Sequence, residues 1–213
     1  MARDMRQIDP ASLHVYDAQY LHCTVATLSR HVDPYVQHYF KNARSILYNA
    51  SRTDRDRVIA TWRQALQRSF ERASGLRPFE LVFRSLESSA AATFVAADDP
   101  SNAMVPLRAI AKEAADDPQV AKLSAELERK YSDVPGLLSL KEAIHIPDIV
   151  HSTVMRHAGV PSDPNGLAGG LAELEAKWNP VTVNVTEIYL VFEGHPYMHI
   201  GRTDGEVHKF SLS

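Results

Sequence analysis

The chain has 213 residues, of which 45% are hydrophobic, and its formal net charge is -3. This length and apolar content suffice for one large domain or two small packed lobes, and so small a net charge argues against a protein that binds polyanions through bulk charge. The single cysteine excludes an internal disulfide framework and fits a reducing compartment.

The N-terminal residues and the hydropathy of the chain bear on its location. Residues 1–10 are charged and lack an apolar stretch, so we expect no secretory signal. No stretch approaches the about 20 apolar residues that a membrane-spanning helix needs. We therefore expect a soluble protein of the cytoplasm, or else of the nucleus, that does not contact a membrane. We also expect it to work as a monomer.

The first predicted strand covers residues 19–28, where apolar and β-branched residues dominate. The polar residues before it, 1–17, are expected to form a loose arm or an edge element. Residues 29–49 are rich in aromatic side chains. These side chains either pack on a helix or form a base-stacking lid beside a site.

The clearest predicted helix covers residues 53–74, in which apolar residues recur at helical spacing. Thr53 or Asp54 can cap its first turn, and Gly75 can end it. The arginines of this helix form either a solvated face with acidic partners or a flank that attracts phosphate.

A β-hairpin and two helices are predicted for the middle of the chain. Residues 76–86 alternate between apolar and polar side chains, and residues 91–96 form a second strand after a polar turn. Residues 103–115 place their apolar side chains on one helical face, and Asp117-Pro118 opens a further helix.

The last third of the chain begins with a predicted strand near residues 149–156. After it we expect, in order, a turn-rich stretch at 159–170, a helix within 167–178, a strand at 181–192 with a bulge or twist near Thr186, and a hairpin between 197–200 and 207–212.

The strand at 19–28 and the strand near 149–156 share the pattern His-x-Thr, as His22 with Thr24 and His151 with Thr153. Alternate side chains of a strand point to the same face, so each His is expected to project with its Thr. Chance alone gives roughly one His-x-Ser/Thr match in such a chain. Two copies in similar contexts are therefore informative, although either His alone could be an ordinary half-buried strand residue.

Each half of the chain follows its motif strand with helical sequence and then a long strand. This order is a weak internal repeat. It predicts an α+β fold in which residues 1–213 form a single bilobal domain, with one His-x-Thr motif contributed by each of two related lobes.

Two imidazoles that face one another are suited to acid–base chemistry. Histidine titrates near neutral pH, so one ring can accept a proton while the other donates one. Neighbouring Thr hydroxyls can donate hydrogen bonds to phosphate oxygens, and they stabilise the charge of a phosphoryl group in the transition state. Such a set can cleave or form a phosphodiester without a metal or another cofactor.

This pair of motifs resembles the two-histidine (2H) phosphoesterase superfamily, which includes the LigT-like RNA 2',3'-cyclic phosphodiesterases (also called RNA 2'-5' ligases) and cyclic nucleotide phosphodiesterases. The resemblance implies two pseudo-symmetric lobes whose antiparallel sheets face a central cleft, with helices outside. It implies that His22 and His151 are catalytic, that Thr24 and Thr153 bind the substrate phosphate, and that the substrate is a cyclic phosphate or a 2'-5'-linked nucleotide or RNA end.

Bacterial LigT-like members often carry an Arg five positions after the second His, and Arg156 stands at this position. The resemblance therefore implies that Arg156 also binds phosphate. Strict alternation would place Arg156 on the face opposite His151, so this role requires a strand end or a twist.

Three other interpretations are open. A metal hydrolase would use His145, His151 and His157, or His195 with His199, but neither a His-Glu-x-x-His pattern nor a Cys pair accompanies them. Cys23 could be a nucleophile, although alternation turns it away from His22. Finally, the same fold could bind a nucleotide or RNA end without turnover, or could be a protein-interaction module. A bell-shaped pH dependence would separate catalysis from simple binding.

Overall fold

The computed structural model describes residues 13–16, 21–28, 44–45, 50–73, 75–89, 92–134, 137–157, 163–191 and 207–213. They form an α+β fold that divides into two compact units. Unit 1 comprises Met1–Thr24, Phe79–Ser101 and Asp148–Val185, and unit 2 comprises Val25–Pro78, Asn102–Pro147 and Thr186–Ser213. No helix in the described part of the chain is both long and apolar enough to cross a bilayer.

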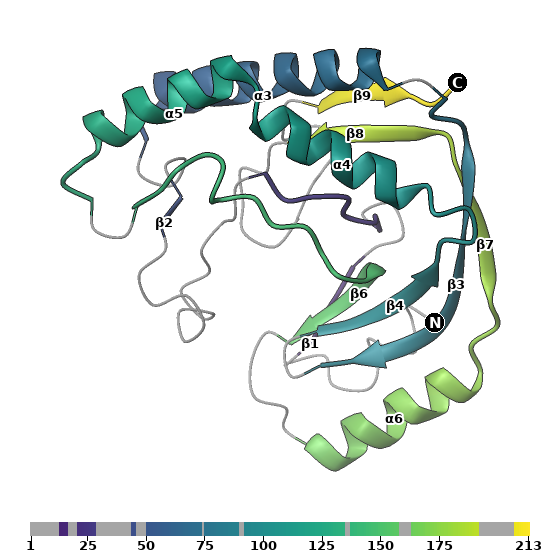
Figure 1. Ribbon diagram of the computed structural model, residues 1–213. Coiled ribbons are helices and arrows are strands. Elements are labelled where there is room, and N and C mark those ends of the chain that lie inside the picture. The colour runs from purple at the N-terminus through teal and green to yellow at the C-terminus, as the bar shows by residue number, and fades with distance from the viewer. Residues whose placement is uncertain are drawn as a thin grey trace. The chain divides into compact units, whose positions relative to one another are not determined.

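Unit 1 is built on a curled, fully antiparallel sheet of five strands in the order β1-β6-β4-β3-β7 (Figure 1). The strands are β1 (Leu13–Val15), β3 (Phe79–Ser88), β4 (Ala92–Asp98), β6 (Val150–His157) and β7 (Val181–Val185). β3 and β4 form the predicted hairpin, and β1 confirms an edge element within residues 1–17.

One face of this sheet is covered by helix α6 (Pro164–Ala176) (Figure 1). The apolar core between them contains the following buried residues: Leu86, Val95, Val154, Met155 and Leu167. Trp178 extends this layer, because its Nε1 donates a hydrogen bond of 3.2 Å to the Phe83 carbonyl. Side chains on the opposite face of the sheet point away from this core.

The helix predicted within residues 167–178 is confirmed by α6, which begins earlier, at Pro164, inside the stretch predicted to be rich in turns. Asp163 caps this helix by accepting a 2.9 Å hydrogen bond from the Gly166 amide, and a proline in the first turn is compatible with a helix. Burial of Leu167 against the sheet then offsets the low helix propensity of the glycines.

Unit 2 contains three helices among its described residues: α3 (Arg52–Arg72), α4 (Met104–Ala115) and α5 (Pro118–Lys130). It also contains two small sheets, a parallel pair of β2 (Arg44–Ser45) with β5 (Leu137–Leu138), and an antiparallel pair of β8 (Glu187–Val191) with β9 (Val207–Ser211). Helix α3 packs on α4, α5 and β9. The three helices confirm the sequence prediction to within a few residues.

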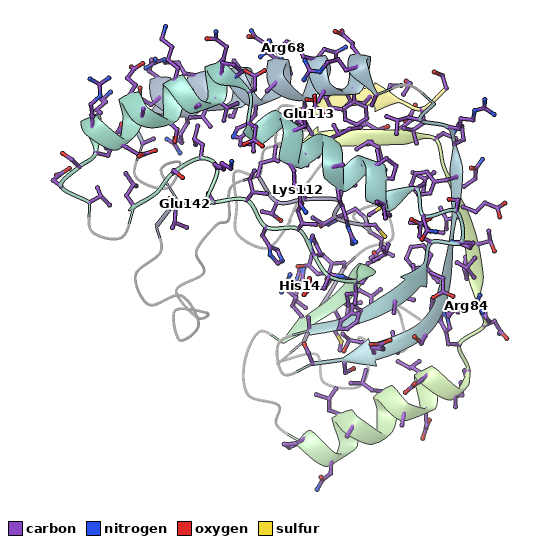
Figure 2. All side chains as sticks on the ribbon, in the orientation of Figure 1. His14, Arg68, Arg84, Lys112, Glu113 and Glu142 are labelled. Atoms are coloured by element: carbon purple, nitrogen blue, oxygen red, sulfur yellow. The ribbon has the colours of Figure 1, made fainter. Side chains whose placement is uncertain are left out.

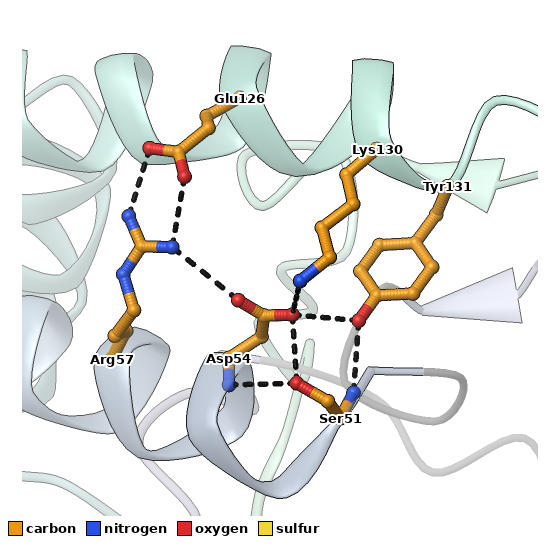
Figure 3. Close-up of polar contacts among 6 residues, drawn as sticks. All are labelled: Ser51, Asp54, Arg57, Glu126, Lys130 and Tyr131. Carbon is orange, nitrogen blue, oxygen red and sulfur yellow. Dashed lines mark hydrogen bonds and ion pairs between the residues drawn. The ribbon is translucent and has the colours of Figure 1, made fainter.

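Helix α3 is capped by Ser51, two or three residues before the residues predicted. Asp54 instead lies at the centre of a polar network, where its buried carboxylate binds Lys130 at 2.6 Å, the Tyr131 hydroxyl at 2.7 Å and Ser51 (Figure 3). The Tyr131 hydroxyl also accepts a hydrogen bond from the Ser51 amide. This network ties the start of α3 to the end of α5.

Three arginines of α3 form ion pairs with acidic residues of α4, of α5 and of the N-cap of α5. The pairs are Arg57–Glu126 and Arg68–Asp117 at 2.8 Å, and Arg72–Glu113 at 2.6 Å. A carboxylate already neutralises each of these guanidinium groups. The helix face with acidic partners is therefore confirmed for these residues, and they do not form a phosphate-attracting flank.

The strand predicted at 181–192 is two strands in different sheets, β7 and β8, which are separated by Thr186. The Thr186 carbonyl accepts a hydrogen bond of 3.0 Å from the Leu212 amide, so this residue leaves the first sheet as the next one begins. The strand predicted at 207–212 is confirmed as β9, which pairs with β8. Residues 197–200 and most of 29–49 lie outside the described residues.

Candidate active site

Strand β6 carries the second motif as predicted. His151 and Thr153 are half-buried, whereas Ser152 between them is only 6% exposed and lies on the face that packs against α6. Phe94 of β4 pairs with Thr153, and its ring meets the His151 ring edge-on at a centroid distance of 5.2 Å. We call the sheet face that carries His151 and Thr153 the site face.

A β-bulge in β6 brings Arg156 onto the site face. In β4 the consecutive residues Phe94 and Thr93 pair with Thr153 and Met155, so Val154 is an extra residue on β6. Val154 and Met155 are both buried, and the alternation resumes one residue later with Arg156 half-buried. The bulge thus places Arg156 on the same face as His151, whereas strict alternation would place it on the opposite face.

Strand β1 adds a residue that the sequence analysis missed. His14 pairs with Arg156 across β1 and β6, and directly opposed residues of a sheet share a face. Figure 2 shows His14 on the side of the sheet away from α6. Its neighbour Val15 packs into the core below, as alternation requires. The only signal in the sequence was the alternation Leu-His-Val-Tyr, which no motif distinguishes.

The first motif does not lie on a strand, so the strand predicted at 19–28 is wrong over its described residues, 21–28. These residues are irregular except for a bridge between Thr27 and His145. The physical reason is that the edge of β6 is already used by β1, and the Tyr16 amide extends that pairing to the Val154 carbonyl. Within the irregular segment His22 is exposed and Thr24 is half-buried.

Both motifs belong to unit 1, contrary to the prediction that each of two lobes contributes one. His22 and His151 interact within this unit. Burial lowers the pKa of His151 below the usual 6.5 of histidine, and the charges of Arg156 and His22 lower it further. A backbone group of Ile149 favours the protonated ring and opposes this shift in part. The structure therefore brings His151, Thr153 and Arg156 onto one face with His22 near enough to influence His151, and Thr24 follows His22 by two residues in the irregular segment.

The position of Cys23 argues against its role as a nucleophile. Burial raises the pKa of the Cys23 thiol to about 12, so the thiol stays protonated at neutral pH. A thiolate is the reactive form of cysteine. The chemistry near His22 is therefore not that of a cysteine enzyme.

No group of three or more potential metal ligands is assembled among the residues that the structure describes. His145 belongs to unit 2, where it bridges Thr27, whereas His151 belongs to unit 1. The pair His195 and His199 lies outside the described residues.

Comparison of the chain with protein families, with curated proteins and with solved structures gives no match. The site offers two imidazoles, a hydroxyl and a guanidinium, which together can move protons and hold an anion.

Proposed function

We propose that this protein is a metal-independent phosphodiesterase of the two-histidine type. Its substrate would be a 2',3'-cyclic phosphate or a 2'-5'-linked nucleotide or RNA end. The observation that carries the proposal is the bulge in β6, because it gathers His151, Thr153 and Arg156 on one face with His22 close enough to influence His151. A base, a hydroxyl donor and a fixed positive charge are the groups that phosphodiester hydrolysis needs.

The lowered pKa of His151 supports its assignment as the general base, since the shift favours the neutral ring that can accept a proton. In hydrolysis of a cyclic phosphate, His151 takes a proton from water as the water oxygen bonds to phosphorus. The bond from phosphorus to one ribose oxygen breaks, and His22 gives that oxygen a proton. The Thr153 hydroxyl donates to a non-bridging oxygen, and the positive charge of Arg156 farther along β6 offsets the charge that builds on the phosphoryl group.

Two apolar side chains beside the histidines support a nucleotide as the substrate. Leu21 precedes His22 and is 38% exposed, and Ile149 lies two residues before His151 and is 47% exposed. Exposed apolar groups next to a charged site can contact the sugar or base of a nucleotide. Phe94 on the same sheet face could add an aromatic contact.

We also infer the bilobal fold of that superfamily, in which two antiparallel sheets face a central cleft. Unit 1 supports this inference by its own construction. Its antiparallel sheet has a helix on one face, and the candidate residues lie on the other.

The proposal is tested by incubating the protein, with EDTA present, with nucleoside 2',3'-cyclic phosphates and with a short 2'-5' oligoadenylate. We expect turnover by the parent and a loss of at least about a hundredfold in His22→Ala and His151→Ala, the range of a general acid or base. Ser152→Ala is the matched control, because Ser152 adjoins His151 but faces the core. It should keep full activity.

Loss of turnover in Ser152→Ala as large as that in His151→Ala would contradict the assignment of the site face. If the parent protein turned over none of these substrates, the proposed phosphodiesterase activity would be contradicted. The protein would then be assigned a role in nucleotide binding or protein interaction.

A further inference from the structure

A second pair of phosphate-binding groups lies beside the proposed reaction centre. His14 and Arg156 are directly opposed on β1 and β6, so their Cβ atoms are about 5 Å apart and both project from the site face. The guanidinium is a planar fork of N–H donors suited to phosphate oxygens. An imidazole N–H donates to phosphate whether the ring is neutral or charged.

This pair is displaced along β6 from the residues that hold the reacting phosphate. Because Val154 is bulged, Arg156 is the next residue after Thr153 on the site face. Consecutive same-face residues of a strand are separated by about 7 Å. Successive phosphates of a nucleotide strand are spaced on the same scale, so one phosphate at Thr153 places a neighbouring phosphate near His14 and Arg156.

We propose that His14 and Arg156 form a second phosphate subsite, and that the preferred substrate therefore carries at least two phosphates. The substrate would be the end of an oligonucleotide rather than a mononucleotide. The assignment of the first phosphate to His151 and Thr153 rests on the proposed function. The second subsite itself rests on the β1–β6 register and on the bulge.

The environment of His14 suits a residue that positions a ligand. Tyr16 is buried, with 6% exposure, and its ring meets the His14 ring edge-on at a centroid distance of 5.0 Å. The contact restricts the orientation of the imidazole, which lowers the entropy that the ring loses when a ligand binds. If His14 were only a packing residue, replacing it with another aromatic residue would change nothing in binding.

The test compares two probes that need no turnover. Adenosine 2'-monophosphate carries one phosphate, and adenosine 2',5'-bisphosphate carries two that are about as far apart as neighbours in a strand. By calorimetry we expect the parent to bind the bisphosphate about tenfold more tightly, the effect of one or two charge-assisted hydrogen bonds. His14→Gln and His14→Phe should each reduce this advantage to the part that Arg156 contributes, while leaving monophosphate binding unchanged.

The matched control is His208→Gln on β9, because His208 also meets an aromatic ring edge-on, at 4.7 Å from Phe210. It should keep the full bisphosphate advantage. Equal binding of the two probes by the parent, or an unchanged advantage in His14→Phe, would overturn the subsite.

Turnover of cyclic phosphates is measured separately on the same variants. If the parent protein prefers the bisphosphate through His14 but turns over no substrate, the proposed subsite is supported and the proposed enzyme activity is contradicted. If the parent turns over cyclic phosphates without this preference, the activity is supported and the subsite is contradicted.

Discussion

The imidazole of His151 is set for its proposed role by its surroundings rather than by its place in a motif. Burial is the largest cause of its lowered pKa, and the charge of Arg156 acts in the same direction. A general base must be unprotonated to work, so activity should persist to a pH below the usual 6.5 of a histidine. Arg156 would then serve two purposes, since it attracts phosphate and also disfavours the protonated form of the base.

Arg156→Gln should therefore raise the pKa of His151, because a positive charge that opposes protonation is removed. The titration of the His151 ring protons by NMR measures this without reliance on activity. In parallel, the acid limb of kcat/KM should move to higher pH. Arg84→Gln is the matched control, because Arg84 is on the same sheet but pairs with Asp98. A pKa of His151 that fell or stayed constant in Arg156→Gln would contradict the arrangement of the site face.

At the scale of elements, β6 shows which parts of the site a sequence can predict. Alternation correctly placed His151 and Thr153 on one face and Ser152 on the other, because it depends only on local strand geometry. The bulge at Val154 depends on pairing with Thr93 and Phe94, which are distant in the chain. No local pattern in β6 could therefore reveal that Arg156 lies beside Thr153.

The strand predictions that were wrong elsewhere also failed because strand pairing depends on residues distant in the chain. The segment with His22 has a strand-like composition, but β1 uses the edge of β6 instead. Residues 181–192 read as one apolar strand, yet hydrogen bonding at Thr186 divides them between two sheets. In contrast, α3, α4 and α5 were predicted well because their apolar stripes and caps are local signals.

The junction of α3 and α5 gives a prediction about stability. Asp54→Asn should lower the free energy of unfolding by about 2 kcal/mol, because it removes a buried acceptor from charged and hydroxyl donors. Hydrogen bonds from Lys130 and Tyr131 hold the pKa of Asp54 below its usual value. The carboxylate therefore stabilises the fold fully above pH about 4, the pKa in an unfolded chain, and progressively less as the pH falls below that value.

Urea unfolding of the parent and Asp54→Asn at pH 7 and pH 3 measures this effect. The difference between the two proteins should be smaller at pH 3. Glu126→Gln is the control within the same network, because the Glu126 side chain is 44% exposed and its ion pair with Arg57 contributes little. A difference between parent and Asp54→Asn that grew on acidification would show that the carboxylate is not held in its charged form.

For the whole molecule, the order of the chain explains why the site is hard to predict. Each unit is assembled from three separate segments of the sequence. In unit 1 the first segment brings His14 and His22, the second brings β3 and β4, and the third brings β6 with His151. The site therefore exists only when segments from the two ends of the chain have met on one sheet.

Separate expression of residues 1–147 and 148–213 tests this assembly. The first fragment lacks β6 and β7, the partners of β4 and β3, so Leu86 and Val95 would lose the core formed with Met155. It also lacks β9, whose Phe210 stacks on Phe70 of α3 at 4.3 Å. Neither fragment should fold alone, because each exposes unpaired strand edges and half of an apolar core.

The two tryptophans make the outcome measurable in each unit, since Trp62 lies in α3 of unit 2 and Trp178 lies in unit 1. In the isolated fragments, their fluorescence should resemble that of the unfolded protein. When the fragments are coexpressed, both signals and protection of the Val95 amide from exchange should return, because the strand pairings do not require an unbroken chain. A stable, protected β3–β4 hairpin in residues 1–147 alone would contradict this, and would mean that the sheet forms before its last segment arrives.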